Sequence, residues 1–378
     1  MKSKIRRVAI WGMSDNKGGI ESVIINIYRH MDKTKVQLDF LLPHDYGEIA
    51  YEDEIIAMGG RIFRIMYSER ESLIKSRTCL LKFFREHPEV KVVHVHANFP
   101  YAFPLVIAKK AGVPIRILHS HNSTELFVGE PGIKGKIKNI RNSVVKKQIN
   151  SVPNLYFSCS DLAAKSMFKD KDYVWVKNGI DLKKFDYDEQ IRNELRREYN
   201  IKKNDKVIGF VGRLREQKNP IFLIDIFNEY TKINDSTKLI VIGDGELQTE
   251  MKSKIEYYGI ENKVRFLGSR NDVYKWYQVF DLLLLPSIYE GLPVVLVEGQ
   301  AAGLPCIASD AITKQIKVTD LLHYKSIGMS PQEWANDIHD ILSKSSRRSY
   351  MDEMRKAGFD IKQAAEQVMQ YYLNGTSD

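Results

Sequence analysis

The stretch DLLLLPSIYEGLPVVLVEGQAAGLPCIAS, residues 281–309, holds the pattern that decides the fold. Its first part, LLLLPS, predicts a buried strand, IYEGLP predicts the turn after it, and Pro293 suits the first turn of a helix. The later run PCIAS predicts a second buried strand. Buried strands that alternate with helices are typical of parallel layers, so the stretch predicts an α/β fold.

The same alternation continues along the rest of the chain. Strands are expected at RRVAIWG, QLDFLL, RIFRI, VVHVHA, IRILHSH, LYFSCS and YVWVKNGID, and again at KVIGFVG, KLIVIGDG and VRFLG. A polar, charged stretch separates the two groups, and 378 residues are too many for one ordinary core. We therefore predict two successive doubly wound units, with a boundary near residues 178–181.

Composition and charge limit the class of protein. Hydrophobic residues make up 43% of the chain and charged residues 28%, as in ordinary soluble proteins. No run approaches the roughly 18–20 apolar residues that span a bilayer, and the apolar stretch near the N-terminus is too short for a signal peptide. Three scattered cysteines suggest a reducing, cytoplasmic compartment. Residues 1–180 hold 29 Lys and Arg against 18 Asp and Glu, so an anionic partner is expected for this half.

Two adjacent glycines follow the first predicted strand, in WGMSDNKGGIES. In an open parallel sheet, ligands bind beyond the carboxyl ends of the strands. Gly18 and Gly19 let the backbone approach a ligand there, and the helix that begins after them offers N–H groups to an anion. A tight turn that binds nothing is the alternative. The segment lacks G-x-G-x-x-G and the Walker Lys-Ser/Thr, which excludes a dinucleotide or P-loop site.

Two cations lie in the loop GRLREQKNP, which follows the strand KVIGFV. Arg213 and Lys218 are five residues apart, so both can reach one diphosphate. The guanidinium forks onto two oxygens and the ammonium acts as a point charge. Two solvated surface cations are the alternative.

Four of the nine histidines fall near the ends of two predicted strands, in HVH and HSHN. We expect a polar wall that binds an acceptor, in which one histidine touches the substrate and the others form hydrogen bonds in the core. The residues assigned to this wall are His96, His119 and Asn122. A metal site is the alternative, but no carboxylate or thiolate completes an obvious ligand set.

Glu290 and Glu298 stand on either side of the apolar run LPVVLV. A buried carboxylate is costly unless something pairs with it. Glu290 is expected in the turn before the helix, beside Gly291, and Glu298 more than one turn further on. A carboxylate accepts hydrogen bonds from both hydroxyls of a vicinal diol, so sugar ligands would satisfy both charges. An ordinary ion pair between Glu298 and a lysine is the alternative.

The segment from Pro131 to Ser160 holds no acidic residue, and GIKGKIKNIRNSVVKKQI within it holds six cations. Ile133, Ile137, Ile140 and Val144 follow helical spacing. Residues 133–149 are therefore expected to lie on an anionic membrane surface, with an ordinary surface helix as the alternative.

Taken together, these segments resemble the family-4 retaining glycosyltransferases of the GT-B fold, above all the bacterial enzymes that build exopolysaccharide or capsule. The likeness covers nearly the whole chain. Its motifs are KGGIES, HSHN, FSCSDLAAKSM, VKNGID, FVGRLREQKNP, IGDGEL, VRFLG and PSIYEGLPVVLVEGQAAGLPCIAS, in the order of the family. The E-x7-E pair with the upstream R-x4-K is the specific signal.

The resemblance implies two Rossmann-like doubly wound domains that face each other across a cleft. Residues 1–180 would bind the acceptor, residues 181–358 would bind the nucleotide sugar, and a C-terminal helix at 359–378 would cross back to the first domain. The base of the nucleotide would be recognised by backbone near residues 266–270.

The resemblance also implies roles for single residues. The catalytic residues would be His121, Arg213, Lys218 and Glu290, with His119 as an alternative to His121 on the donor sugar. The nucleotide-sugar site would comprise Gly18, Gly19, Gly212, Arg213, Lys218, Gly268, Glu290, Gly291, Leu292, Pro293 and Glu298.

The expected reaction moves a hexose from a UDP or GDP sugar to a saccharide or a polyprenyl-diphosphate-linked saccharide, with retention. Fixed cations and helix N-termini would stabilise the leaving diphosphate, and no metal or other cofactor is expected. A nucleotide-sugar epimerase or hydrolase of the same architecture is the nearest rival. A basic scaffold or nucleic-acid-binding protein is a distant one, because no recognised binding motif appears. The turn GDGEL has two glycines only, which excludes a nicotinamide dehydrogenase.

Overall fold

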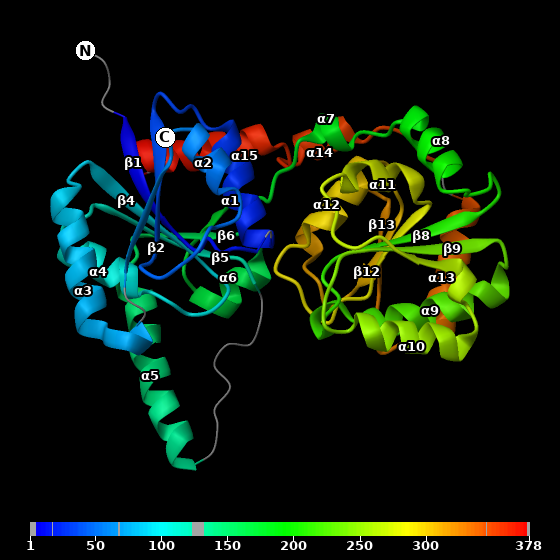
Figure 1. Cartoon of the computed structure of the whole chain (residues 1–378), viewed down its shortest axis with the longest axis horizontal. Helices are drawn as coiled ribbons and strands as arrows, with labels where there is room; N and C mark the ends of the chain where they lie inside the picture. Colours follow the sequence, from blue (N-terminus) through cyan, green and yellow to red (C-terminus); the bar gives the residue numbers. More distant parts are fainter. Residues whose placement is uncertain (1–4, 17, 67–68, 123–131, 345, 376–378) are drawn as a thin grey trace. The chain divides into compact units, whose positions relative to one another are not determined.

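The computed structural model describes residues 5–16, 18–66, 69–122, 132–344 and 346–375. The chain forms two compact units (Figure 1). Unit 1 comprises Met1–Gly179 with Ile361–Asp378, and unit 2 comprises Ile180–Asp360. The first division lies within the range 178–181, and the second lies two residues after the expected start of the crossing-back helix. Where the chain passes between the units, Ile180 N donates to Phe359 O at 2.9 Å.

Unit 1 is built on a parallel sheet of seven strands in the order β3-β2-β1-β4-β5-β6-β7. Its strands are β1 (Arg6–Trp11), β2 (Val36–Pro43), β3 (Arg61–Met66), β4 (Val90–Ala97), β5 (Ile115–Ser120), β6 (Leu155–Ser158) and β7 (Val174–Trp175). Its helices are α1 (Gly19–His30), α2 (Glu52–Ala57), α3 (Glu69–Glu86), α4 (Phe103–Lys110), α5 (Gly132–Ser151), α6 (Asp161–Phe168) and α15 (Ile361–Asn374).

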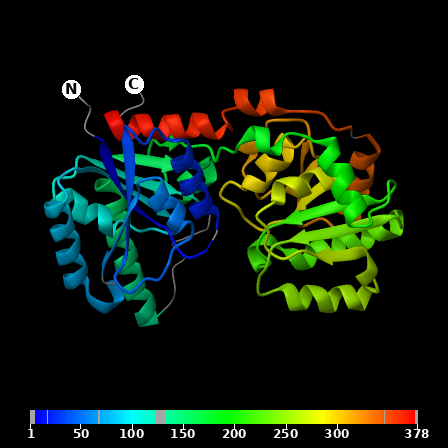
Figure 2. The ribbon, with the colours of Figure 1, turned by 45° about the horizontal axis from the view of Figure 1, so that its top comes forward.

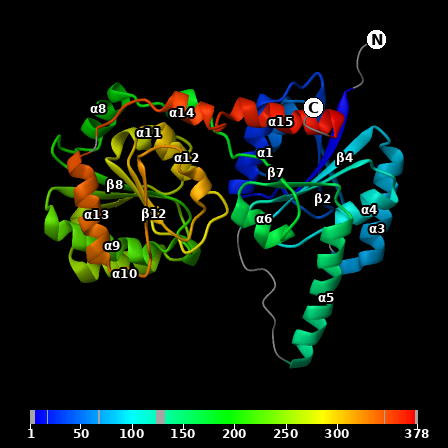
Figure 3. The ribbon, with the colours of Figure 1, turned by 180° about the vertical axis from the view of Figure 1, so that it is seen from behind.

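Both faces of this sheet are covered, as its nearly continuous apolar strands require. One core cluster joins alternate residues of β1 and β2 to α1 and α15. The other joins the intervening residues, including Ala9 and Leu41, to α3, α4 and α6. Figures 2 and 3 show α15 next to α1, although the two helices lie near opposite ends of the sequence. The C-terminal helix is therefore part of the core of unit 1, with Ala365, Val368 and Tyr372 buried.

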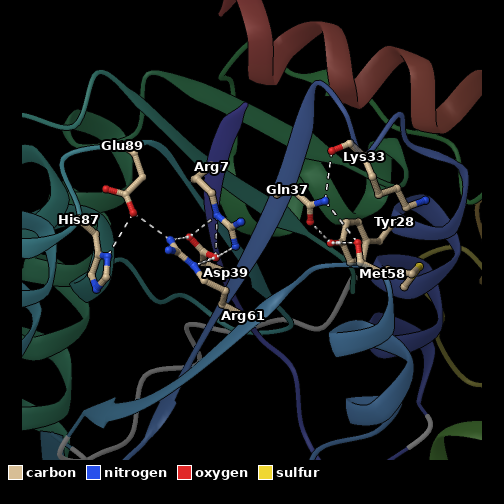
Figure 4. A network of polar contacts seen from close by, with 9 residues as sticks. All are labelled: Arg7, Tyr28, Lys33, Gln37, Asp39, Met58, Arg61, His87 and Glu89. Atoms are coloured by element: carbon tan, nitrogen blue, oxygen red, sulfur yellow. Dashed lines mark hydrogen bonds and ion pairs between the residues drawn. The ribbon is translucent and has the colours of Figure 1, made fainter. Parts of the chain in front are cut away.

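A charged network crosses the first three strands of unit 1 (Figure 4). Asp39 of β2 is fully buried and accepts hydrogen bonds from Arg7 of β1 and Arg61 of β3, the latter at 2.8 and 2.7 Å. Arg61 also pairs with Glu89 at 3.0 Å. Because a buried carboxylate is costly without partners, the two guanidinium groups hold β1, β2 and β3 in register.

Unit 2 has a six-stranded parallel sheet in the order β10-β9-β8-β11-β12-β13. Its strands are β8 (Lys206–Val211), β9 (Thr237–Ile242), β10 (Val264–Phe266), β11 (Leu282–Leu285), β12 (Cys306–Ser309) and β13 (Leu322–Lys325). Its helices are α7 (Leu182–Phe185), α8 (Glu189–Glu198), α9 (Pro220–Ile233), α10 (Gln248–Tyr258), α11 (Val273–Val279), α12 (Val294–Ala301), α13 (Pro331–Lys344) and α14 (Met351–Lys356), with short 3-10 turns η1 (Glu216–Lys218), η2 (Glu261–Lys263) and η3 (Lys314–Ile316). The edge strand β13 was not predicted from the sequence.

The predicted parallel α/β architecture is confirmed, and each sheet has one topological switch point. In unit 1 the strand order reverses between β1 and β4, and in unit 2 it reverses between β8 and β11. Loops that leave two such neighbouring strands in opposite directions open a crevice beyond their carboxyl ends, where ligands of these folds bind. The switch points therefore locate the candidate site in each unit.

Within the described parts of the chain, no helix is both long and apolar enough to cross a membrane. The helix expected to lie on a membrane is present as α5. The side chains of Ile133, Ile137 and Ile140 lie outside the described residues, and Val144 is exposed. Membrane association through residues 133–149 stays a prediction.

Candidate functional site

An ion pair lies at the switch point of unit 2. Lys218, the last residue of η1 after β8, places Nζ 2.5 Å from Glu290 Oε1 in the turn after β11. Gln217 Nε2 donates to Glu290 Oε2 at 3.3 Å and to Tyr289 O at 3.1 Å. The side chains of Lys218 and Glu290 are only 15% and 8% exposed. The structure thus brings these two predicted site residues together, and Lys218 is not the solvated surface cation of the alternative interpretation.

Close packing between the loops after β8 and β9 fixes the position of Lys218. Gly243 has φ +129°, and a Cβ atom there would lie 2.0 Å from Gly212 O, so only glycine fits. A Cβ atom on Gly212 would in turn lie 3.3 Å from Lys218 Cε. The aliphatic part of the Lys218 side chain therefore lies close to the backbone of Gly212, just after β8.

Arg213 follows Gly212 directly at the same switch point. Its side chain is exposed, and it forms no ion pair with any residue in the described part of the chain. An exposed cation beside a buried one can bind an incoming anion without first breaking a contact within the protein.

Glu298 lies on α12 and its side chain is mostly buried. Its Oε2 accepts a hydrogen bond of 2.6 Å from the hydroxyl group of Tyr277 on α11. Burial raises the pKa of Glu298 to about 7, while the Tyr277 hydrogen bond and the charge of Lys184 lower it in part. Burial also raises the pKa of Tyr277, so that its hydroxyl stays a donor. Among the described residues Glu298 forms no ion pair with a lysine, although the charge of Lys184 acts on it; of the two glutamates, Glu290 is the one that pairs with lysine.

The remaining residues predicted to bind nucleotide sugar in unit 2 lie in loops at the same edge of the sheet. Gly268, with φ +64°, accepts a hydrogen bond from Gly243 N at 2.9 Å, which joins the loop after β10 to the loop after β9. Gly291 and Leu292 lie in the turn before α12. Pro293 is the N-cap of α12 rather than a residue of its first turn, because the helix begins at Val294.

The glycine pair of unit 1 lies at the other switch point. Gly18 caps α1 with φ −87°, and a Cβ atom on Gly19 would meet nothing within 4 Å. Backbone conformation requires glycine at neither position, and packing does not require it at Gly19, which argues against the tight-turn alternative. The space beside Gly19 leaves this part of the start of α1 open to a ligand. The neighbouring Glu21 is buried and accepts a hydrogen bond from Ser14 Oγ at 2.5 Å.

The four histidines near the strand ends form a compact array on β4 and β5. His94 Nε2 lies 3.2 Å from His119 Nδ1, and His96 Nδ1 lies 2.9 Å from His121 Nε2. The rings of His94 and His96 stack with their centroids 3.9 Å apart, and the ring centroids of His119 and His121 lie 4.0 Å apart. Tyr372 of α15 places its hydroxyl 2.6 Å from His94 Nδ1.

The array is a set of core imidazoles with one member at the edge of the sheet. His94, His96 and His119 are 1%, 5% and 0% exposed, whereas His121 is only partly buried. His119, assigned to the acceptor wall, therefore has no surface through which it could touch a substrate. Asn122 is partly buried beside His121.

The three buried histidines have ligating atoms within 4.8 Å of one another, close enough for a metal ion. Their ring planes argue against that use. The in-plane lone pairs of stacked rings run parallel instead of converging on one point, so His94 and His96 cannot share an ion without rotating. The geometry fits two hydrogen-bonded imidazole pairs instead.

Acid should destabilise unit 1 through these histidines. Burial lowers the pKa of His94, His96 and His119 well below 6.5, and lowers that of His121 to about 3. The unfolded chain therefore binds more protons below pH 6.5, so the free energy of unfolding falls as the pH drops through that value, by up to about 1.4 kcal/mol per pH unit for each buried histidine. Urea unfolding between pH 7.5 and 5.5 checks this, and His119→Gln should reduce the slope. Equal slopes in the two proteins would contradict it.

Several residues at these edges were not predicted from the sequence. Gln217 contacts Glu290, but it lies among other polar residues that give no sequence signal. Tyr277 contacts Glu298, but the sequence of its helix indicates no site. At the unit 1 switch point Trp11 stacks on Tyr101, with their ring centroids 5.8 Å apart. The ring centroid of Phe99, a residue that is 59% exposed, lies 6.1 Å from that of Tyr101. The aromatic-rich HANFPYAF after β4 could have signalled this row.

A pocket of about 320 Å³ lies elsewhere in unit 2, against residues such as Tyr199, Lys238 and Arg265 near the starts of β9 and β10. It touches none of the predicted site residues and lies at the amino ends of the strands. Ligands of this fold bind at the carboxyl ends, so the switch point and not this pocket is the candidate site.

Comparison with known proteins identifies the family of the chain. Residues 17–184 match the Glycosyltransferase Family 4 domain, and residues 191–357 match Glycosyl transferases group 1. The chain is 30% identical to the putative glycosyltransferase EpsF of Bacillus subtilis over 98% of this chain and 97% of EpsF. It is 25% identical to the UDP-Gal:alpha-D-GlcNAc-diphosphoundecaprenol alpha-1,3-galactosyltransferase of Escherichia coli over 80% of this chain and 81% of that enzyme. Among solved structures, Anabaena HepE in complex with UDP and glucose has a TM-score of 0.74 at 19% identity, covering 97% of this chain and 98% of HepE. The chain thus belongs to the family-4 glycosyltransferases of the GT-B fold.

Proposed function

We propose that this glycosyltransferase moves a hexose from a UDP or GDP sugar to a saccharide or lipid-linked saccharide, with retention of configuration, in the synthesis of exopolysaccharide or capsule. The observation that carries the proposal is the Lys218–Glu290 pair beside the exposed Arg213 at the switch point of unit 2. A diphosphate needs the two cations, and a sugar needs the hydrogen-bond acceptor that lies next to them.

In the proposed complex the donor lies over the carboxyl ends of β8 and β11. Arg213 and Lys218 bind the diphosphate, and Glu290 accepts hydrogen bonds from the transferred sugar. Lys218 has three N–H donors, so it can keep Glu290 as a partner while it binds a phosphate oxygen. The pair therefore holds the ammonium group in place before the donor arrives.

Breaking the bond between the sugar and the diphosphate builds positive charge on the anomeric carbon and negative charge on the leaving oxygen. Fixed cations that meet this charge lower the barrier because they need not reorganise during the reaction. We assign that role to Lys218 and Arg213, so the chemistry requires no divalent ion. Activity that survives an excess of EDTA supports this assignment, and activity restored only by added Mg²⁺ or Mn²⁺ contradicts it.

The acceptor side of the proposal rests on unit 1. Asn122, which is partly buried, and Phe99, which is exposed, lie beyond the carboxyl ends of β5 and β4. The Escherichia coli relative acts, by its name, on a sugar carried by diphosphoundecaprenol, which supports a lipid-linked acceptor here. Such an acceptor would bring the enzyme to the inner face of the membrane. Flotation with and without anionic liposomes tests this. If the protein does not float with the anionic liposomes, the proposed membrane association is wrong.

Donor binding should depend on pH through Glu298. We propose that Glu298 accepts hydrogen bonds from the ribose diol, which favours the carboxylate over the acid. With a pKa of about 7 in the free protein, acidification protonates the group and weakens binding, about tenfold between pH 8 and pH 6. Calorimetry with UDP-glucose, whose diphosphate does not titrate in this range, measures the effect.

Two variants test that assignment. Glu298→Gln should bind UDP-glucose more weakly and without the pH dependence. Tyr277→Phe loses the hydrogen bond that stabilises the carboxylate, so the midpoint of the pH dependence should move to higher pH. If the pH dependence of Glu298→Gln equals that of the wild type, Glu298 does not contact the ribose. GDP-mannose replaces UDP-glucose if only guanine nucleotides bind.

Product analysis separates the proposal from its nearest rival. Thermal-shift measurements with UDP, GDP and their sugar conjugates identify the donor, because a ligand that binds only the native state raises its stability. The enzyme is then incubated with that donor, with and without polyprenyl-diphosphate-linked saccharides. Transfer that requires the acceptor and yields an anomer of unchanged configuration supports the proposal. Epimerised or hydrolysed donor at the same rate without acceptor favours an epimerase or hydrolase.

A further inference from the structure

The histidine array contains one hydrogen bond that reaches the edge of the sheet, between His96 and His121. His96 lies near the end of β4, and His121 directly follows β5 at the carboxyl edge. His96 is 5% exposed and His121 is partly buried, so the buried ring lies behind the accessible one. The nitrogens that face each other are His96 Nδ1 and His121 Nε2, 2.9 Å apart. His121 Nδ1, the other ring nitrogen, forms no hydrogen bond with any described residue, so it can serve a ligand.

Proton counting shows what this hydrogen bond controls. A neutral imidazole carries one N–H and one lone pair, so the pair shares a single proton between the two facing nitrogens. If His96 donates that proton, His121 Nδ1 is an N–H donor; if His121 donates it, Nδ1 is an acceptor. The tautomer of His96 therefore decides what His121 offers to a ligand.

The surroundings keep both rings neutral. Burial lowers the pKa of His121 to about 3, and burial together with the charges of His94, His119 and His121 lowers the pKa of His96 well below 6.5. Within the described ranges, the titratable groups that lie against the pair are His94 on β4 and His119 on β5. Both are imidazoles, so neither supplies the negative charge that a protonated ring would need.

We propose that His96 is a positioning residue, which fixes the ring and the tautomer of His121 so that His121 presents one defined nitrogen to the substrate at the carboxyl edge of unit 1. The part of this inference that concerns catalysis rests on the proposed function. The part that concerns the tautomer does not, because it follows from the free protein.

Four variants of the full-length protein test the inference. His96→Leu and His96→Gln both remove the contact with His121, the first with an apolar side chain and the second with an amide at the wrong distance. His96→Asn places an amide near the position of Nδ1 and should restore the contact. His94→Gln is the matched control, because it disturbs the array and leaves the bond between His96 and His121 in place. Circular dichroism and thermal unfolding confirm that each variant is folded.

The first readout is ¹⁵N NMR of imidazole-labelled protein without ligand, with His121 assigned from His121→Asn. Wild type and His94→Gln should show His121 as one neutral tautomer throughout pH 5.5–8. In His96→Leu and His96→Gln, His121 should show mixed tautomers and a pKa closer to 6.5, and His96→Asn should return it toward wild type. If His121 keeps its wild-type tautomer and pKa in a folded His96→Leu or His96→Gln protein, the inference is wrong.

The second readout is the pH dependence of kcat/KM for the nucleotide-sugar donor. Loss of the hydrogen bond should lower kcat/KM about tenfold and add a decline below pH 7, and His96→Asn should recover most of the loss. If kcat/KM is equal in wild type and His96→Leu across the pH range, the part of the inference that concerns catalysis is wrong. If the wild type transfers no sugar but its His121 tautomer depends on His96, the proposed function fails and the positioning role stands.

Discussion

Lys218→Ala should lower the rate of sugar transfer by about 100-fold to 1,000-fold while the protein stays folded. That is the range for removing one fixed group that stabilises charge in a transition state. The ammonium group lies against Glu290 at the end of β8, where the leaving diphosphate is placed in the proposed complex. The loss should appear mainly in kcat, because the developing charge on the leaving oxygen is greater in the transition state than in the bound donor. Steady-state kinetics with saturating acceptor measures it.

Lys254→Ala is the matched control for this prediction. Lys254 pairs with Asp225 at 2.7 Å and is 26% exposed, so the change breaks a partly buried lysine–carboxylate pair between α9 and α10. Its kcat should equal that of the wild type. A double-mutant cycle with Glu290→Gln then tells whether the two residues act as a unit, since the combined loss would be smaller than the product of the single losses. Wild-type turnover in Lys218→Ala would remove Lys218 from the mechanism.

The second large effect concerns stability. Asp39→Ala should lower the free energy of unfolding of unit 1 by about 3 kcal/mol, the lower end of the range for breaking a buried ion pair. The carboxylate is fully buried, and its loss leaves Arg7 without its anion and Arg61 with Glu89 alone. Arg7 and Arg61 are 15% and 37% exposed, so water replaces part of the interaction and the upper end of the range is not expected. Hydrogen exchange in β1 and β2, compared with β8 and β9, reports the change in unit 1 alone.

Glu54→Ala provides the comparison on the surface of the same unit. Glu54 pairs with Arg29 at 2.6 Å, but both side chains are more than a third exposed. Such pairs contribute at most about 1 kcal/mol. If Asp39→Ala costs no more than Glu54→Ala, the buried network does not hold the three strands together.

The sequence predicted the elements well where the pattern was strong and local. Runs such as LLLLPS and VVHVHA became central strands, because continuous apolar residues suit strands buried on both faces. The short edge strand β13, LHYK, was missed because only its first residue is fully buried and its mixed composition gives no such pattern. Pro293 was placed one residue too far into α12, since the signal for a helix start does not distinguish the cap from the first turn.

Part of the candidate site was likewise proposed from local sequence patterns. Arg213, Lys218 and Glu290 were proposed because they lie in loops that follow predicted strands, and Glu298 because it interrupts an apolar run. Their role in binding a donor stays a prediction. Their partners were not found. The contact of Lys218 with Glu290 and that of Glu298 with Tyr277 join residues 72 and 21 positions apart, and nothing in the local sequence indicates such pairs.

The sequence by itself determined the alternation of strands and helices, the division near residue 180 and the loops that carry charge, because these follow from short-range hydrophobic pattern and turn chemistry. Only the tertiary structure decided which glutamate takes the lysine, which histidine reaches the surface, and that α15 completes the core of unit 1. Those outcomes depend on strand order and on contacts between residues far apart in the chain. Packing and burial determine these outcomes, and neither can be read from the order of residues along the chain.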